Sequence, residues 1–388
     1  MEAVEQYDDS ALREIILARV RERGQLTFAE FMAASLYEPG LGYYTSPGKK
    51  VGAEGDFYTS SNVHQVFGRL IAREIHRMWQ TMGEPERFDV VEVGAGNGRL
   101  AADIMDTLAE LDRRFYETVT CRLIEAEPTL RELQRELLAA HLGRVVWSEP
   151  ADLAEGRLSF AGCLYSNELI DSFPVHLVEM TGDGLREVYV TNAGDELREI
   201  LGEPSTPELA AYLGQLGIVL VTGQRVEINL AAPVWLKSVV QSLSRGFVMT
   251  IDYGYLAEEL YAPIRMNGTL LCYFRHTIEE NPYIRLGRQD MTSHVDFSTL
   301  IRVGEALGLG KVWYGEQYRF LMGTGMLEEL MAMEARAATE EERLKNRLTL
   351  KKLMLPDGGM GDTFKVLIQA KGVDDPRLLC MREWAKGF

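Results

Sequence analysis

The feature that most constrains this chain is a strand-like run that breaks into three closely spaced glycines. Residues 88–93, Phe-Asp-Val-Val-Glu-Val, favour a strand, and Gly94, Gly96 and Gly98 follow with the spacing G-x-G-x-G. Glycine permits a tight turn and lets a ligand approach the backbone without a Cβ in the way. The apolar spacing of residues 100–108 predicts a helix, whose first N–H groups and positive dipole end favour a carboxylate or a phosphate. We therefore expect a strand–turn–helix unit that binds a nucleotide-like ligand.

The glycine spacing narrows the choice of ligand. The dinucleotide fingerprint is G-x-G-x-x-G, whereas this turn is one residue shorter and has Glu92 two positions before its first glycine. A carboxylate at that place suits an ammonium group better than a pyrophosphate, and S-adenosylmethionine carries both an ammonium and a carboxylate. A tight turn without a ligand is the competing interpretation. The residues expected to contact the cofactor here are Glu92, Gly94, Ala95, Gly96, Asn97 and Gly98.

A second strand pattern, residues 119–125, ends on the acidic Glu125. At the carboxyl end of the second strand, a carboxylate is placed to accept hydrogen bonds from ribose hydroxyls. The alternative is a residue that precedes a helix starting near Pro128. A third apolar run, residues 144–147, comes next, and either Trp147 or Asp152 could contact the adenine or simply pack.

The remaining patterns predict an open, mostly parallel α/β sheet. Residues 161–167 and 246–253 read as the fourth and fifth strands, and further strands are expected around 311–320 and 363–370. The segment between strands four and five is far longer than a crossover helix requires. We expect a helical and loop-rich N-terminal region (1–83) that contributes to the cofactor pocket, a core (84–167 and 246–388, with an insertion at 254–297), and an inserted substrate or partner lobe (168–245).

Composition favours a globular enzyme and disfavours some partners. The chain has 388 residues, 46% of them hydrophobic, and a formal net charge of −17, which argues against nonspecific binding to nucleic acid or acidic membranes. Its four cysteines lie far apart, which predicts buried thiols and neither a metal site nor a disulfide framework. The acidic start lacks a targeting pattern and no run has the length of a membrane span, so a cytoplasmic location is expected.

Polar residues at the ends of strands four and five are the candidates for chemistry. Asn167 and Glu168 would face the cleft beside the cofactor, where a carboxylate could hold a cationic nucleophile. Their alternative is capping of a helix start. Asp252 ends the fifth strand and is either a substrate contact or a turn residue. His294, in a polar run before Asp296, is either a general base or a hydrogen-bonded loop residue.

An ordered set of motifs runs along nearly the whole chain: YEPGLGYY (37–44), GDFYTS (55–60), VEVGAGNG (91–98), SNELIDSFPV (166–175), IDYG (251–254), QDMTSHVDF (289–297) and GMGDTFKVL (359–367). Taken together, these motifs resemble the MidA-like S-adenosylmethionine-dependent methyltransferases, a family related to a mitochondrial complex I assembly-factor arginine methyltransferase. The resemblance implies a class I, Rossmann-like methyltransferase fold with an added lobe. Carried over by motif, Gly94, Gly96, Gly98 and Glu125 belong to the cofactor site, and Asn167 and Glu168 lie where cofactor meets substrate. We also expect Tyr58, Thr59 and Ser60 to contribute to the cofactor pocket.

The resemblance also implies the class of substrate. Its mitochondrial member methylates arginine in a protein, so we expect a protein arginine N-methyltransferase with S-adenosylmethionine as cofactor and a protein as partner. The net charge and the lack of a membrane-span pattern argue against nucleic acid and membrane as partners. The arginine methyltransferases proper carry two glutamates on one hairpin; Glu168 matches one, whereas Glu179 lies in a strand-like run. Two alternatives stay open: an assembly chaperone that retains the fold, and a small-molecule O- or N-methyltransferase. The oligomeric state, with a homodimer among the candidates, is also open.

Overall fold

The computed structural model describes residues 9–46, 64–275, 277–354 and 363–382 of the chain. These residues divide into two compact units. We call the unit of Thr59–Leu169, Trp235–Tyr253 and Ile301–Phe388 the sheet unit. The unit of Met1–Tyr58, Ile170–Val234 and Gly254–Leu300 is called the lobe unit. The three-part division expected from the sequence stays a prediction.

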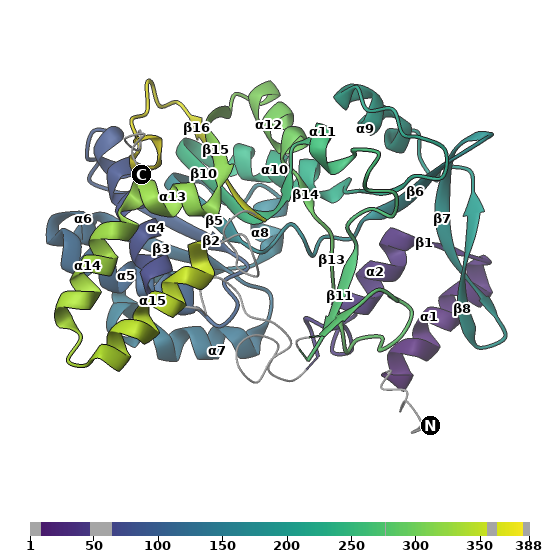
Figure 1. Cartoon of the computed structure of the whole chain (residues 1–388), viewed down its shortest axis with the longest axis horizontal. Helices are drawn as coiled ribbons and strands as arrows, with labels where there is room; N and C mark the ends of the chain where they lie inside the picture. Colours follow the sequence, from purple (N-terminus) through teal and green to yellow (C-terminus); the bar gives the residue numbers. More distant parts are fainter. Residues whose placement is uncertain (1–8, 47–63, 276, 355–362, 383–388) are drawn as a thin grey trace. The chain divides into compact units, whose positions relative to one another are not determined.

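The sheet unit is built on a twisted, mostly parallel sheet, which confirms the expected fold class (Figure 1). The spatial order of its strands is β15 (Gly310–Glu316), β16 (Phe364–Lys371), β10 (Leu243–Tyr255), β5 (Phe160–Asn167), β2 (Phe88–Val93), β3 (Val119–Ile124) and β4 (Val145–Ser148). The last five of these strands, from β10 to β4, run parallel to one another, while β16 is antiparallel to both β10 and β15. Parallel strands place their carboxyl ends along one edge, where ligands bind in open α/β sheets.

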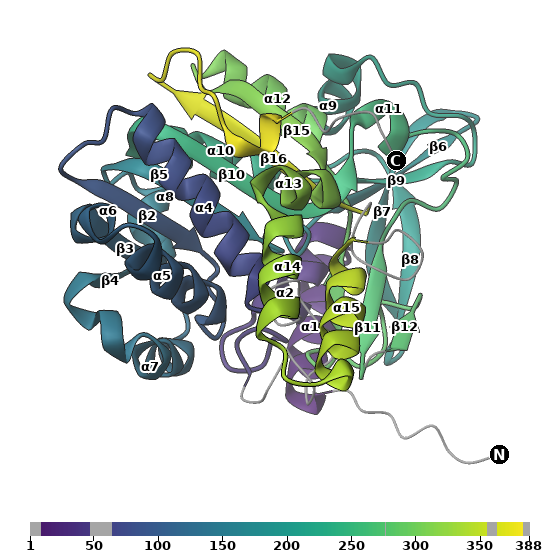
Figure 2. The same cartoon turned by 60° about the vertical axis from the view of Figure 1, so that its left-hand side comes forward.

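Apolar helix faces cover this sheet. The helix α4 (Val66–Thr81) buries Phe67, Leu70 and Ile71 in a core that also contains Phe247 and Phe364 from the strands, and α4 and α13 lie over one face of the strands (Figure 2). The other helices of this unit are α5 (Arg99–Leu111), α6 (Arg113–Thr118), α7 (Pro128–Leu137), α8 (Pro150–Ala154), α13 (Gln317–Thr324), α14 (Met326–Arg336) and α15 (Glu340–Met354), most of α10 (Ala231–Ser242) and α12 (Phe297–Ala306), and the short 3-10 helices η1 (Ala139–Arg144) and η2 (Leu379–Met381).

The lobe unit contains two small antiparallel sheets and two packed N-terminal helices. In the larger sheet, β7 pairs with β1, β6 and β8, and β9 pairs with β6; in the smaller sheet, β11 lies between β12 and β13. The helices bury apolar side chains such as Leu12, Phe28 and Phe31. Its elements are α1 (Ser10–Arg23), β1 (Leu26–Thr27), α2 (Phe28–Tyr37), β6 (His176–Thr181), β7 (Gly184–Ala193), β8 (Glu196–Gly202), α9 (Glu208–Leu216), β9 (Arg225–Ile228), α11 (Ala257–Leu260), β11 (Leu271–Phe274), β12 (Thr277–Glu279), β13 (Asp290–Thr292) and β14 (Val295–Asp296).

One strand expectation was too long. The strand expected around 311–320 ends at Glu316, and the helix α13 begins at Gln317. Phe320, Leu321 and Thr324 are buried on this helix. Residues three and four positions apart share one face of a helix, as Leu321 and Phe320 do with Thr324. The residues up to Glu316 instead pair with β16 as a strand.

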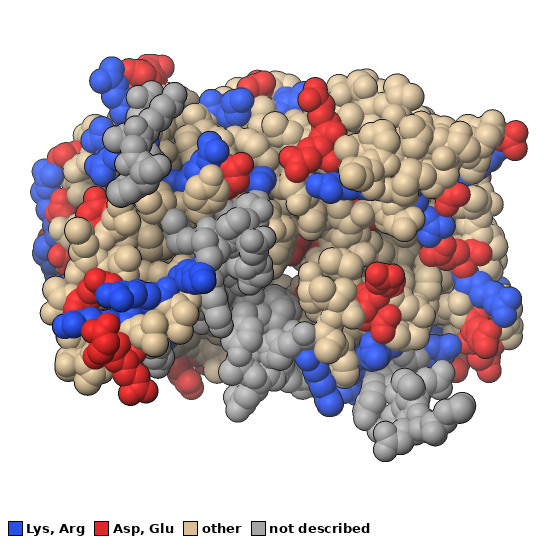
Figure 3. All heavy atoms as spheres, in the orientation of Figure 1, with Lys and Arg blue, Asp and Glu red and all other residues tan. Residues whose placement is uncertain are grey.

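The surface carries mixed charge over α14 and α15. Arg347 pairs with Glu334 at 2.5 Å and Arg343 with Glu340 at 3.1 Å, and blue and red side chains alternate over this part of the face in Figure 3. Exposed pairs of this kind contribute little to stability and mainly keep the helix surface hydrated. Among the described residues, no helix has both the length and the apolar character needed to cross a membrane.

Close packing of α4 against α5 yields a testable prediction. A Cβ added at Gly68 would lie 2.6 Å from the Cβ of Asp103 on α5, so an alanine there must push the helices apart. We expect Gly68→Ala to lower the free energy of unfolding by about 1–3 kcal/mol, because overpacking exceeds the helix-propensity gain of about 1 kcal/mol. Urea denaturation measures this change. In the control, Gly143→Ala, the added Cβ meets nothing within 4 Å; an equal effect of both substitutions would contradict the prediction.

Candidate functional site

The glycine turn lies at the carboxyl end of β2, directly before α5. Gly94, Gly96 and Gly98 all have positive φ, of 73°, 52° and 83°. A Cβ on Gly94 would lie 2.9 Å from Leu169, and one on Gly98 would lie 2.8 Å from Gln134, whereas one on Gly96 would meet nothing within 4 Å. The outer glycines are thus required by packing as well as by φ. The space beside Gly96 is free of described atoms, as expected where a ligand approaches.

Hydrogen bonds to the neighbouring strand and within the chain help to fix the turn. The Gly94 N–H donates to the carbonyl of Ile124 at the end of β3 (3.1 Å). The Asn97 side chain accepts from the N–H of Arg99 (3.0 Å), which satisfies one of the free donors at the start of α5. Ala95 is buried. Of the residues expected to contact the cofactor, Asn97 therefore shapes the turn through its own side chain.

Glu92 is buried near the end of β2 and is held by a tyrosine. Only 3% of the residue is exposed, and its carboxylate accepts a hydrogen bond from the hydroxyl of Tyr165 on β5 (2.9 Å). Burial raises the pKa of Glu92 to about 8; the Tyr165 hydrogen bond lowers it, and the nearby Glu125 raises it. A cationic group bound beside Glu92 would favour the charged carboxylate. The environment therefore fits an ammonium ligand such as the methionine end of S-adenosylmethionine.

Glu125 follows β3 directly and is mostly buried. One carboxylate oxygen accepts from the N–H of Glu127 (3.0 Å), and the other lies 3.4 Å from the side-chain nitrogen of Gln134. Burial raises its pKa, against the lowering effect of these hydrogen bonds. The carboxylate is thus oriented by protein donors at the strand end where a ribose is expected.

The two residues considered for the adenine are both engaged. The indole N–H of Trp147 donates to the side-chain oxygen of Gln134 (2.8 Å), and the Arg135 guanidinium lies 4.9 Å from the Trp147 ring centre. Asp152 accepts from the N–H of Glu149 (2.9 Å) and from Arg157 (2.8 Å) at the start of α8. These contacts describe Asp152 as a helix-capping residue, while an adenine contact by either residue stays a prediction.

Asn167 and Glu168 lie together at the end of β5. The side-chain nitrogen of Asn167 donates a hydrogen bond to the carboxylate of Glu168 (2.9 Å). Because a carboxylate can only accept, this bond assigns the nitrogen and the oxygen of the Asn167 amide. The Asn167 Oδ1 atom is buried and accepts no hydrogen bond from any described residue. Glu168 has a φ of 51°, a left-handed conformation that is uncommon for a residue with a Cβ. Such backbone is kept where the surroundings hold it in place, often at functional sites.

Asp252 on β10 is the residue that holds this turn. It is fully buried; one oxygen accepts from the N–H of Leu169 (3.2 Å) and the other from the N–H of Tyr253 (2.9 Å). The Glu168 N–H donates to the carbonyl of Ile251 (2.9 Å), and the Tyr253 hydroxyl lies 3.5 Å from the Glu168 carboxylate. Asp252 therefore positions the backbone around Glu168; its direct catalytic role stays a prediction.

Other candidates belong to the lobe unit or fall outside the described residues. The N–H of His294 donates to Thr269 (3.0 Å) and its ring lies 5.3 Å from the ring of Tyr255. Glu179 is part of β6 and pairs with Arg225 at 3.1 Å, so it occupies a strand and not a hairpin loop. A general-base role of His294 stays a prediction. Tyr58, Thr59 and Ser60 lie outside the described residues.

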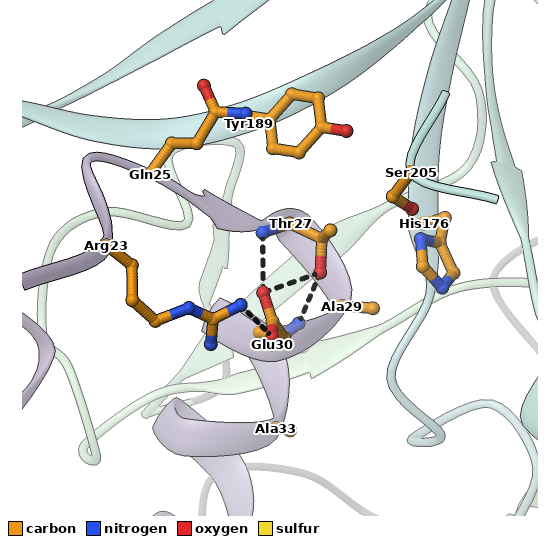
Figure 4. A pocket seen from close by; sticks show the side chains of 9 residues that line it. All are labelled: Arg23, Gln25, Thr27, Ala29, Glu30, Ala33, His176, Tyr189 and Ser205. Atoms are coloured by element: carbon orange, nitrogen blue, oxygen red, sulfur yellow. Dashed lines mark hydrogen bonds and ion pairs between the residues drawn. The ribbon is translucent and has the colours of Figure 1, made fainter. Parts of the chain in front are cut away.

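The lobe unit has an open pocket of about 630 Å³ between α2 and the larger sheet (Figure 4). Polar groups on its α2 side hydrogen-bond to one another: the Glu30 carboxylate accepts hydrogen bonds from Arg23 (2.7 Å) and from the N–H of Thr27 (2.9 Å). On the opposite wall, His176 pairs with the buried Glu187 at 2.7 Å. The pocket is lined by Arg23, Gln25, Thr27, Ala29, Glu30, Ala33, His176, Tyr189 and Ser205.

Sequence reasoning missed two residues that organise the site. Tyr165 holds Glu92, and Gln134 joins the turn to Glu125. Tyr165 and Gln134 left no signal of these roles, because one lies inside an apolar strand and the other on a charged helix.

Comparisons with known proteins agree with this chemistry. A family model described as S-adenosyl-L-methionine-dependent methyltransferase matches residues 70–315. The Xenopus tropicalis protein named protein arginine methyltransferase NDUFAF7, mitochondrial, is 25% identical over 395 residues, covering 93% of this chain and 87% of the relative. The human protein of that name is 27% identical over 339 residues, covering 80% and 72%. A Burkholderia thailandensis crystal structure with bound S-adenosyl-homocysteine is 30% identical, with a TM-score of 0.85, covering 97% of this chain and 95% of that one.

One expectation is corrected by these relatives. The acidic start of the chain predicted a cytoplasmic location, which is contradicted by relatives that are named as mitochondrial proteins. The prediction was wrong because it relied on the lack of a targeting pattern at the start of the sequence, and that lack does not determine the cellular location of a protein.

The raised pKa of Glu92 predicts how stability varies with pH. Below its ordinary value of 4.5, folded and unfolded chains both hold the proton; between 4.5 and about 8 only the folded chain keeps it. Rising pH therefore costs stability over this range, by up to about 1.4 kcal/mol per pH unit, and no more is lost above it. Glu92→Gln lacks this titration. We therefore expect the free energy of unfolding of Glu92→Gln, measured without ligand by urea denaturation, to rise relative to that of the native protein between pH 5.5 and 8.5.

The exposed Glu136 provides the control. Glu136→Gln should have nearly the native pH dependence. If the free energy of unfolding of Glu92→Gln also changed with pH in the same way as that of the native protein from pH 5.5 to 8.5, Glu92 would have an ordinary pKa in the folded chain and the prediction would be wrong.

Proposed function

We propose that this chain, which belongs to the S-adenosyl-L-methionine-dependent methyltransferases, methylates arginine side chains of a partner protein. The proposal has two supports: relatives that span most of the chain are named protein arginine methyltransferases, and the end of β5 offers acceptors for a donor-rich cation. The second support is the observation on which the proposal mainly rests.

The acceptors suit a guanidinium for a chemical reason. Asn167 Oδ1 is buried without a described donor, and it lies beside the carboxylate of Glu168. A guanidinium carries five N–H donors and no acceptor, so an amide oxygen next to a carboxylate complements both its hydrogen bonds and its charge. A hydroxyl substrate has one donor and no charge, so it would use only one of these acceptors and would not complement the carboxylate charge. The pair therefore favours a cationic nitrogen substrate over an O-methylation substrate.

The cofactor would be held by residues at the same edge of the sheet. The glycine turn leaves room beside Gly96, Glu92 offers a carboxylate for the ammonium group, and Glu125 offers one for the ribose. When bound, S-adenosylmethionine supplies an electrophilic methyl group, and S-adenosylhomocysteine is the other product. The chain's own task is then to align one substrate nitrogen and to accept the proton that this nitrogen loses. Glu168 is our candidate for alignment, held in place by Asp252.

Cofactor binding is tested at Gly96. We expect Gly96→Arg to abolish binding of S-adenosylhomocysteine in calorimetry, because the side chain would fill the space beside the turn. Gly156→Arg is the matched control: Gly156 also has a positive φ, of 68°, and also has nothing within 4 Å of an added Cβ, but it lies after α8. Undiminished binding by a folded Gly96→Arg protein would refute the placement of the cofactor.

Substrate alignment is tested at Glu168. We expect Glu168→Gln to keep the affinity for S-adenosylhomocysteine but to reduce methyl transfer by roughly 10- to 100-fold, the equivalent of losing one charge-assisted hydrogen bond. Transfer is measured with radiolabelled S-adenosylmethionine and lysate proteins, with mass spectrometry to find methylarginine. The exposed Glu155→Gln serves as the control.

Three outcomes would count against the proposal. Label on a residue other than arginine would contradict the substrate class. Label only on small molecules would favour a small-molecule methyltransferase. Bound partner protein without any label would favour an assembly chaperone.

A further inference from the structure

The helix α7 buries a polar residue where an apolar one is expected. Gln134 is fully buried, whereas Leu133 and Leu137 on the same helix are 47% and 44% exposed. Among the residues of α7, only Gln134 is buried. An amphipathic helix normally turns its leucines inward, because burial of apolar side chains stabilises the fold. Leu138, four residues later and directly after α7, is also fully buried, so Gln134 is an amide among packed apolar positions and its contacts need a separate explanation.

Gln134 connects three parts of the expected cofactor site. Its nitrogen donates to the carbonyl of Gly96 (2.8 Å) and lies 3.4 Å from the Glu125 carboxylate; its oxygen accepts from the indole N–H of Trp147 (2.8 Å). Both N–H groups and the oxygen of the amide are thus directed at the turn, at the carboxylate after β3 and at the ring on β4. No other described side chain hydrogen-bonds both the glycine turn and Glu125.

The fit of this side chain depends on the turn itself. A Cβ on Gly98 would lie 2.8 Å from the Cγ of Gln134 and 3.2 Å from its Cα. The third glycine therefore lets α7 approach the turn closely enough for the amide to reach Gly96. Gly98 and Gln134 form one packed unit, so the distance from the turn to Glu125 is set by a side chain and not only by the two strands.

Stability alone does not explain a buried amide here. The net contribution of a satisfied hydrogen bond to stability is small, and an apolar side chain of the same size would match it by burial. What an apolar residue cannot do is direct an amide N–H at a carboxylate. We infer that Gln134 is a positioning residue that orients the Glu125 carboxylate, relative to the glycine turn, for the ribose hydroxyls of the cofactor. This inference rests on cofactor binding at the turn.

The inference predicts a defect confined to the ribose. In the native protein, removal of the ribose 2′-hydroxyl from S-adenosylhomocysteine should weaken binding by roughly 10- to 100-fold, as expected for a hydrogen bond to a charged group. In Gln134→Met, binding of S-adenosylhomocysteine should weaken by roughly 10-fold, and the loss on removing the hydroxyl should fall to about threefold or less. KM for the cofactor should rise while kcat at saturation stays within about twofold. Gln215→Met, at an exposed glutamine of α9, is the control.

A double-mutant cycle separates positioning from general loosening. If Gln134 acts through Glu125, Gln134→Met should have little further effect in a Glu125→Ala background. Additive losses, or an unchanged hydroxyl effect in Gln134→Met, would overturn the inference. Failure of the native protein to bind S-adenosylhomocysteine would instead overturn the proposed function, so the two failures can be told apart.

A second variant keeps the test valid if Gln134→Met does not fold. Gln134→Glu retains the size and the acceptor for Trp147, and its protonated form can still donate one hydrogen bond. Deprotonation places a second negative charge beside Glu125, so affinity for S-adenosylhomocysteine should fall with rising pH more steeply than in the native protein. The same pH profile for both proteins would contradict the role assigned to Gln134.

Discussion

The parallel pairing of β2 with β3 on one side and β5 on the other is the constraint on which the site depends. In this register Val93 lies opposite Ile124 and Ser166, so the residues just beyond each strand emerge at one edge. The glycine turn, Glu125 and Asn167 come from segments far apart in sequence, yet the ladder places them side by side. A slip of one residue would turn each side chain to the opposite face of the sheet.

The strand ends are then joined by hydrogen bonds that use few side chains. Backbone donors link Gly94 to Ile124 and Glu168 to Ile251, while the buried Asp252 accepts from the N–H of Leu169. Glu92 and Glu125 are acids in buried surroundings, and both have raised pKa values because burial disfavours their charged forms. Carboxylates in such a place are suited to cationic or hydroxyl ligands, since a ligand restores the partners that burial removed.

Much of the fold and the place of the candidate site could be predicted from local patterns. Apolar runs, alternating or continuous, located the strands of the parallel sheet, because buried strand positions recur with a characteristic spacing. The glycine turn and Glu125 were predicted at the strand ends because a turn of positive φ favours glycine and because ligands bind beyond the carboxyl ends of parallel strands; their contacts with a cofactor stay a prediction. The α13 segment was mistaken for strand because a short apolar run fits either period. Gln134 and Tyr165 were missed because their roles come from partners distant in sequence.

The sequence by itself determined the strand–turn–helix unit, the positions of the parallel strands along the chain and the acidic residues after them, since each depends on near neighbours along the chain. The tertiary structure decided the rest. It showed that space remains beside Gly96 and not beside Gly98, that Asp252 holds the turn of Glu168, and that Asn167 keeps a buried acceptor. These properties arise where three strands and a helix converge. The physical reason is that burial and hydrogen-bond partnership are set by atoms that the chain brings together only on folding.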